Sequence, residues 1–124
     1  MESNELIKKV IRICYEVHNE LGCGYSEKIY ENALLIALAD AGFDACSQHL
    51  LEVLFRERVI GEFFVDVLVE GTLLLELKAV ATIDGVHKAQ LLNYLKASNR
   101  ESGLLINFGT LKLGVNRLYN QYFV

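Results

Sequence analysis

The segment at residues 65–80, VDVLVEGTLLLELKAV, constrains the fold most, because two apolar strand-like runs flank a short turn. Strands alternate faces, so Glu76 and Lys78 project from one side of the second run and its leucines from the other. Asp66 interrupts the first run in the same way. Charged side chains are rarely fully buried unless they are paired or bound to a metal. These three residues therefore make the segment a candidate functional site.

Two helices are predicted before this segment. Apolar residues recur at helical spacing from Ile7 to Leu21, and Gly22 is placed to end that helix. Ser26 is a candidate N-cap for a second helix, which Gly42 would end. The expected inward-facing positions of the second helix are Ile29, Ala33, Leu34, Ala37, Leu38 and Ala41.

Strand patterns and one more helix account for most of the remaining chain. We expect three consecutive strands, joined by turns at RER and EGT, at residues 46–55, 59–69 and 73–80. Asp84 is placed to cap a third helix that continues to about Ser98. Residues 103–109 and the tail from Gly114 have strand character. This order predicts an α/β sheet with an antiparallel meander and a helical crossover into a further strand.

Composition limits the classes of function. The chain has 124 residues, which suits one domain with a real core, and 52% of them are hydrophobic. Its net charge of −4 argues against a broad basic surface for duplex DNA and leaves room for a local basic patch only. No apolar run approaches the ~20 residues of a membrane span, so we expect a cytoplasmic protein. The cysteines lack zinc-type spacing and are expected to be free thiols: Cys14, Cys23 and Cys46.

The charged residues of the hairpin allow two interpretations. Two neighbouring carboxylates raise each other's pKa unless a cation lies between them. Hard divalent ions such as Mg²⁺ bind carboxylates, carbonyls and water, so Asp66 and Glu76 with a nearby lysine can form a hydrolytic centre. Alternatively, Glu76 and Lys78 form a surface ion pair and Asp66 faces water. The E-x-K spacing alone does not decide between them.

Two other segments contain candidate site residues. Glu27 lies in the first turn of the second helix, where an acid also interacts favourably with the helix N-terminus. Gln90 and Tyr94 are four residues apart and share one face of the third helix with His87. They either point into a site or lie at the edge of the core. His87, like His18, is more often a structural histidine.

Four blocks of sequence carry a family resemblance. They are VHNELGCGYSEKIYENAL, FFVDVLVEGTLLLELKAV, HKAQLLNYLKAS and GLLINFG. In this order and spacing the chain resembles the GxxExxY proteins, assigned to the PD-(D/E)XK nuclease-like superfamily, with the name-giving motif at Gly24, Glu27 and Tyr30. The resemblance implies a single domain at 1–124 with a three-layer α/β fold. In that restriction-endonuclease-like core, helices flank a mixed central sheet.

The resemblance also implies a metal centre. Asp66 and Glu76 would hold Mg²⁺ or Mn²⁺ together with the backbone carbonyl of Leu77. Glu27 would bind the ion directly or through water. Lys78 would orient the attacking water or help to deprotonate it.

The remaining site residues are expected around that centre. Gln90 and Tyr94 match a QxxxY element, in which Gln90 would fix Lys78 or a phosphate and Tyr94 would contact the substrate backbone. Tyr30 is a second candidate for substrate contact.

Three functions remain open from the sequence. The first is a metal-dependent nuclease acting on DNA or RNA. The second is a non-catalytic module on the same fold that binds nucleic acid or protein, which the acidic net charge favours. The third is a structural subunit of a larger system. The aromatic C-terminal strand also offers an edge through which a homodimer could form.

Overall fold

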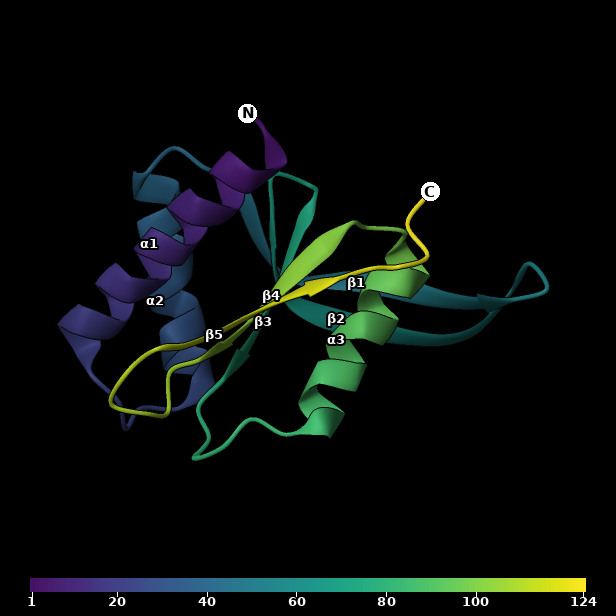
Figure 1. Ribbon diagram of the computed structural model, residues 1–124. Coiled ribbons are helices and arrows are strands. Elements are labelled where there is room, and N and C mark those ends of the chain that lie inside the picture. Colours follow the sequence, from purple (N-terminus) through teal and green to yellow (C-terminus); the bar gives the residue numbers. More distant parts are fainter.

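The computed structural model describes residues 1–124 and shows a central sheet with helices on both faces (Figure 1). The elements in chain order are α1 (Ser3–Leu21), α2 (Glu27–Asp40), β1 (Ala45–Phe55), β2 (Arg58–Val69), β3 (Leu73–Lys78), α3 (Gly85–Ser98), β4 (Ser102–Asn107) and β5 (Gly114–Tyr119). The strands lie in the order β1-β2-β3-β4-β5. Only β3 and β4, which α3 connects, are parallel. The predicted three-layer α/β fold is confirmed.

The larger core lies between the sheet and the pair α1 and α2. The apolar stripe of α1 faces inward, and the helix ends at Gly22, whose φ of 73° is a left-handed conformation that glycine adopts easily. From the sheet, Leu75 and Leu77 project into this core. Cys14 is fully buried there, which raises the pKa of its thiol to about 12. All three cysteines are free, as the sequence predicted.

A smaller core lies between the opposite face of the sheet and α3. Leu74 and Leu105 from the sheet pack there against Leu91 and Leu95 of the helix. Because side chains alternate along β3, Glu76 and Lys78 also project on the α3 side, as predicted. No helix is both long and apolar enough to cross a membrane.

Some local predictions for α2 and β3 were wrong. Ile29 is 43% exposed, and the buried residues in that part of α2 are instead Tyr30 and Glu31. Ser26 is the N-cap residue, but its side chain makes no capping hydrogen bond. Ala41 is exposed because it lies beyond the last helical residue. Strand β3 ends at Lys78, two residues earlier than expected.

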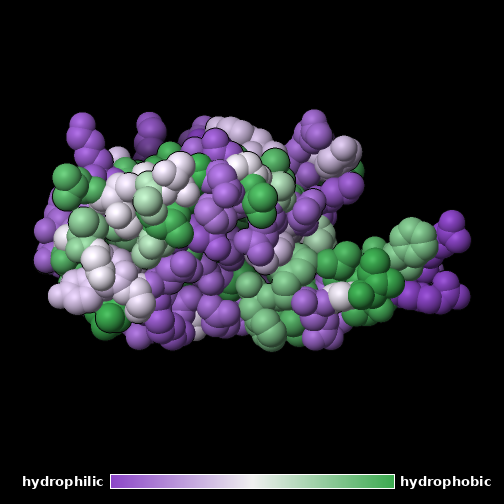
Figure 2. Space-filling model, turned by 90° about the horizontal axis from the view of Figure 1, so that it is seen from below, coloured by the Kyte–Doolittle hydropathy of each residue, from purple (hydrophilic) through white to green (hydrophobic).

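The hairpin of β1 and β2 is much longer than the rest of the sheet. Its ladder runs from the pair Ala45 and Val69 to the pair Phe55 and Arg58, whereas β2 and β3 share only three pairs. The outer half of the hairpin therefore projects from the body as an arm (Figure 1). Hydrophobic residues gather along this arm, and hydrophilic ones at its tip (Figure 2).

Candidate active site

The candidate site lies where β2 and β3 part. The three pairs between these strands end at Val67 and Leu75, so Asp66 and Glu76 are the first residues beyond the ladder. Their carboxylates take the place of the missing backbone acceptors. The Asp66 N–H donates to Glu76 Oε1 at 3.0 Å, and the Leu77 N–H donates to Asp66 Oδ2 at 2.8 Å. The two carboxylates thus lie across the opening between the strands and satisfy backbone donors there.

The alternation of side chains along β2 breaks at Asp66. Val65 and Leu68 both pack in the α3-side core, whereas Val67 packs in the core of α1 and α2. Two residues three apart share a face only when one residue between them departs from strict alternation. Opposite Asp66, in β1, Gln48 has a left-handed φ of 52°, which is uncommon for a residue with a side chain. Both strands are therefore irregular at the site, as is common beside functional residues.

Among the acids of the site, Glu76 has the most strongly shifted pKa. It is 6% exposed. Burial first, and then the negative charge of Asp66, raise its pKa from 4.5 to about 8. The pKa of Asp66 is also raised by burial, although the Leu77 N–H and Gln48 oppose that shift. Two partly desolvated carboxylates therefore lie together with too little positive charge to keep both ionised at neutral pH.

Lys78 supplies part of that positive charge. It is half-buried, and its ammonium lowers the pKa of both Asp66 and Glu76 without forming an ion pair within 4.0 Å of either. The Lys78 carbonyl accepts from the Phe108 N–H on the β4 side at 2.8 Å. Backbone groups of successive residues in a strand point to opposite edges, so the Leu77 carbonyl faces the gap beside Asp66.

Glu31 and Gln48 form a network behind Asp66 that the sequence did not predict. The Gln48 side-chain amide donates to Glu31 Oε1 at 2.8 Å and to Asp66 Oδ1 at 3.3 Å. Glu31 is 3% exposed and also accepts from Lys28 Nζ at 2.6 Å. Glu31 lies four residues after Glu27, so helical spacing was the one signal that placed both on one face. Nothing in the sequence marked Gln48.

Glu27 lies near the site but not within its closest group. Its side chain is exposed in the first turn of α2, and its negative charge contributes to the raised pKa of Glu76. No group of three or more His, Cys, Asp or Glu side chains is arranged to hold a metal ion. The structure thus brings Asp66, Glu76 and Lys78 together and leaves Glu27 at the margin of the site.

Tyr30 has a structural environment. Its side chain is fully buried and stacks on Phe108, with ring centroids 4.6 Å apart. Its hydroxyl donates to the Gly22 carbonyl at 2.5 Å and accepts from the Tyr25 N–H at 3.3 Å. A ring held in this way has no free polar tip, so we do not retain Tyr30 as a substrate contact. The motif tyrosine instead fixes the loop that leads into α2.

Gln90 and Tyr94 face the site from α3. The pKa of Tyr94 is raised by burial and by the negative charges of Glu76 and Asp66, which places its hydroxyl near both acids. Gln90 is exposed, and its side chain opposes the rise in the pKa of Tyr94. Phe63 of β2 stacks on the Tyr94 ring, with centroids 3.9 Å apart. The Tyr94 ring is therefore held against β2 by Phe63.

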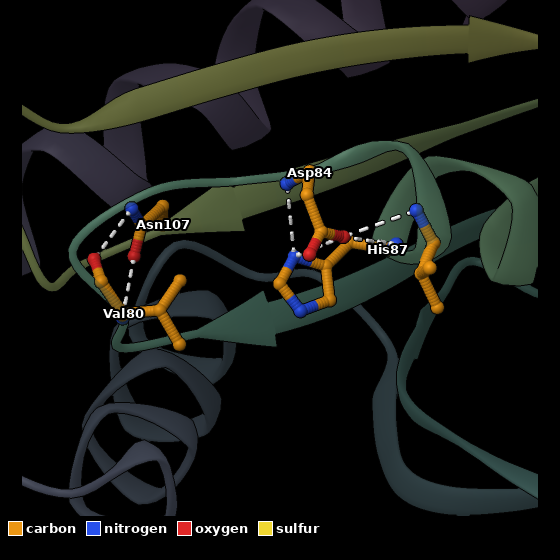
Figure 3. Close-up of polar contacts among 5 residues, drawn as sticks. Val80, Asp84, His87 and Asn107 are labelled. Carbon is orange, nitrogen blue, oxygen red and sulfur yellow. Dashed lines mark hydrogen bonds and ion pairs between the residues drawn. The ribbon is translucent and has the colours of Figure 1, made fainter.

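His87, His18 and the segment that follows β3 make structural hydrogen bonds. His87 belongs to a capping box in which Asp84 Oδ1 accepts from the Val86 and His87 N–H groups (Figure 3). His18 Nε2 lies 2.9 Å from the Thr110 carbonyl oxygen. Asn107 hydrogen-bonds both the N–H and the carbonyl of Val80, which fixes the chain just beyond Lys78 (Figure 3).

Comparisons with known proteins identify the family. A model of the PD-(D/E)XK nuclease superfamily matches residues 4–118. The chain belongs to this superfamily. The predicted membership of the superfamily is confirmed.

A structural relative supports the fold. A solved structure entitled "Crystal structure of SSO0001" aligns with a TM-score of 0.59 and 19% identity, covering 75% of this chain. At that identity the likeness shows a shared fold only. The aligned region spans 49% of that longer chain. No curated protein matches this sequence.

Proposed function

We propose that this PD-(D/E)XK protein is a metal-dependent phosphodiesterase that cleaves nucleic acid. The observation that carries the proposal is the pair Asp66 and Glu76, joined through backbone donors at the opening between two strands, with Lys78 beside them. We also propose that it is a GxxExxY protein, from Gly24, Glu27 and Tyr30.

The residues present suit a hard divalent ion. The donor set consists of oxygen atoms: the carboxylates of Asp66 and Glu76 and the Leu77 carbonyl, with Glu27, at the margin of the site, proposed as a further ligand directly or through water. Burial and the negative charge of Asp66 raise the pKa of Glu76 to about 8, and a bound cation would relieve the repulsion between the two acids. When bound, Mg²⁺ or Mn²⁺ would activate water and stabilise negative charge on the phosphate oxygens.

The protein's own side chains would orient the attacking water, the substrate and the metal ligands. Lys78 Nζ has three donors on the same strand face as Glu76, and we assign it the orientation of the attacking water and the scissile phosphate. Tyr94 presents its hydroxyl to the substrate backbone. Gln90, one helical turn before Tyr94 on the same face of α3, positions the Tyr94 hydroxyl. Gln48 and Glu31 hold Asp66 from behind.

A second candidate function is a binding module on the same fold. The exposed Glu27 and the lack of a close three-acid group favour it. Such a module would bind nucleic acid through the same face without cleaving it.

Cleavage assays separate the two functions. Single- and double-stranded DNA and RNA are incubated with the protein in Mg²⁺, Mn²⁺ or EDTA. The proposal predicts metal-dependent cleavage that Asp66→Asn reduces at least a thousandfold, whereas Asp40→Asn, at the exposed end of α2, leaves it unchanged. Binding of the same substrates without cleavage in either metal would overturn the nuclease and favour the module.

A further inference from the structure

An apolar groove lies between the projecting arm of the hairpin and α3. Its volume is about 860 Å³, within the range of ~300–1,000 Å³ typical of ligand sites. Most of its lining residues are hydrophobic, and the principal ones are Leu54, Phe55, Ile60, Phe63, Val86 and Ala89. Several of these are largely exposed, including Ile60 at 65% and Val86 at 75%. We call this feature the hairpin groove. An exposed apolar surface of this kind marks a binding site more often than it is incidental.

The hairpin groove is continuous with the candidate active site. Gln90 and Tyr94 line it, and Tyr94 also responds to the charges of Asp66 and Glu76. Phe63 and Tyr94, whose rings stack, both line the groove, so its wall includes a side chain that senses the carboxylates of Asp66 and Glu76. A polymer whose phosphate lies at the acids would have its next residues in the groove.

The charge on the α3 side of the groove suits a polyanion, whereas arm residues 52–62 carry two arginines and three acids. Residues 85–124 contain five Lys and Arg and one acid, a formal charge of +4, whereas residues 1–84 contain seven and fifteen, a charge of −8. The one charged residue lining the groove is Lys96. At the tip of the arm, the Arg56 guanidinium lies 4.9 Å from the centre of the Phe55 ring. Helix α3 contains no acid.

We propose that the hairpin groove binds the unpaired bases of a single strand, so that single-stranded DNA or RNA is the substrate of the proposed nuclease. Sites for single strands combine cationic rims with apolar and aromatic surfaces on which bases stack. A duplex keeps its base faces stacked inside and presents phosphates and groove edges, to which an apolar channel offers little. Lys96 and Arg56 would contact phosphates while the bases lie against the apolar wall. This inference rests on the proposed function.

Binding measurements in EDTA test the groove without cleavage. Fluorescence anisotropy compares labelled single strands of DNA and of RNA, the matching duplexes, and a single strand of the same length built from abasic nucleotides. We expect the natural single strands to bind at least tenfold more tightly than both the duplexes and the abasic strand. The abasic strand retains every phosphate, so equal affinity for it would show that the bases are not bound and would overturn the inference.

Two variants locate the binding surface. Ile60→Glu places a negative charge in the groove at a largely exposed position and should reduce single-strand affinity at least tenfold. Leu111→Glu adds the same charge at an 89% exposed position between β4 and β5 and should leave affinity unchanged. Phe55→Ala, which adds no charge, should weaken binding in the same direction. Thermal melts confirm that the variants are folded.

The remaining outcomes separate this inference from the proposed function. Duplexes cleaved as fast as single strands would overturn the inference and leave the nuclease intact. If Ile60→Glu binds nucleic acid normally but sedimentation shows that it turns a dimer into a monomer, the groove is a protein interface and the inference fails. Groove-dependent binding of single strands without cleavage would support the groove and overturn the nuclease.

Discussion

The two halves of β2 differ sharply, and Asp66 divides them. The inner half, Val67–Val69, pairs with β1 on one side and β3 on the other, and all three residues are buried. The outer half pairs with β1 alone and exposes Val59, Ile60 and Phe64 by at least 50% each. The inner half holds the backbone rigid, and the loss of the β3 partner leaves donors that only side chains can satisfy. The acids lie at this boundary because it combines a fixed backbone with an open edge.

The largest expected effect is the contrast in stability between these halves. Leu68→Ala, in the inner half, should reduce the free energy of unfolding by about 2–5 kcal/mol, because it leaves a cavity in a packed core. Ile60→Ala, in the outer half, should change it by less than ~1 kcal/mol, since the side chain is 65% exposed. Urea unfolding measures both. Equal losses would show that the arm is packed in solution and would remove the contrast.

The stability of the protein should depend on pH through Glu76, which lies at this boundary. In the metal-free protein the pKa of Glu76 is about 8 when folded and near 4.5 when unfolded. Between these pH values the folded state binds a proton that the unfolded chain releases, so the free energy of unfolding should fall as pH rises, by up to about 1.4 kcal/mol per pH unit. Glu76→Gln should flatten this slope. A wild-type stability in EDTA that rises from pH 5 to 8 would contradict the burial of an acid at this site.

A smaller effect is expected from the network behind Asp66. Gln48→Ala removes the amide that joins Glu31 to Asp66 and should weaken Mn²⁺ binding about tenfold, a size typical of residues that orient metal ligands. Gln121→Ala, at an exposed position near the C-terminus, is the matched control. Calorimetric titration measures both, and identical affinities would show that Gln48 has no positioning role.

The features that the sequence predicts are those set by local signals. Local signals placed most elements within two residues, because Gly22 and Asp84 mark helix ends chemically and the EGT turn separates two apolar runs. The shared face of Glu76 and Lys78 also followed from alternation along β3, whereas alternation breaks at Asp66 in β2. These features depend on contacts that are near in sequence or set by strand geometry.

Other features depend on distant contacts and could not be predicted. Tyr30 was expected at the substrate, but its partner Phe108 lies at the opposite end of the chain. The role of Gln48 depends on a left-handed backbone within a strand, which the sequence does not mark. The groove arises because the β1–β2 hairpin extends beyond the end of β3. The β1–β2 ladder is longer than the β2–β3 ladder, and the hydrophobicity of the sequence does not reveal this difference.

The central claim is that the parting of β2 and β3 creates a divalent-cation site from Asp66 and Glu76. Thermal melts with and without millimolar Mn²⁺ test it most directly, on the wild type, Asp66→Asn and Glu76→Gln. A bound ion stabilises the fold by RT ln(1 + [L]/Kd), so we expect the wild-type Tm to rise by about 3 °C or more. Each variant should melt at or slightly above the metal-free wild type, because an amide requires neither a buried charge nor a bound proton, and should show no metal-dependent rise. An unchanged wild-type Tm, or equal rises in all three proteins, would contradict the account.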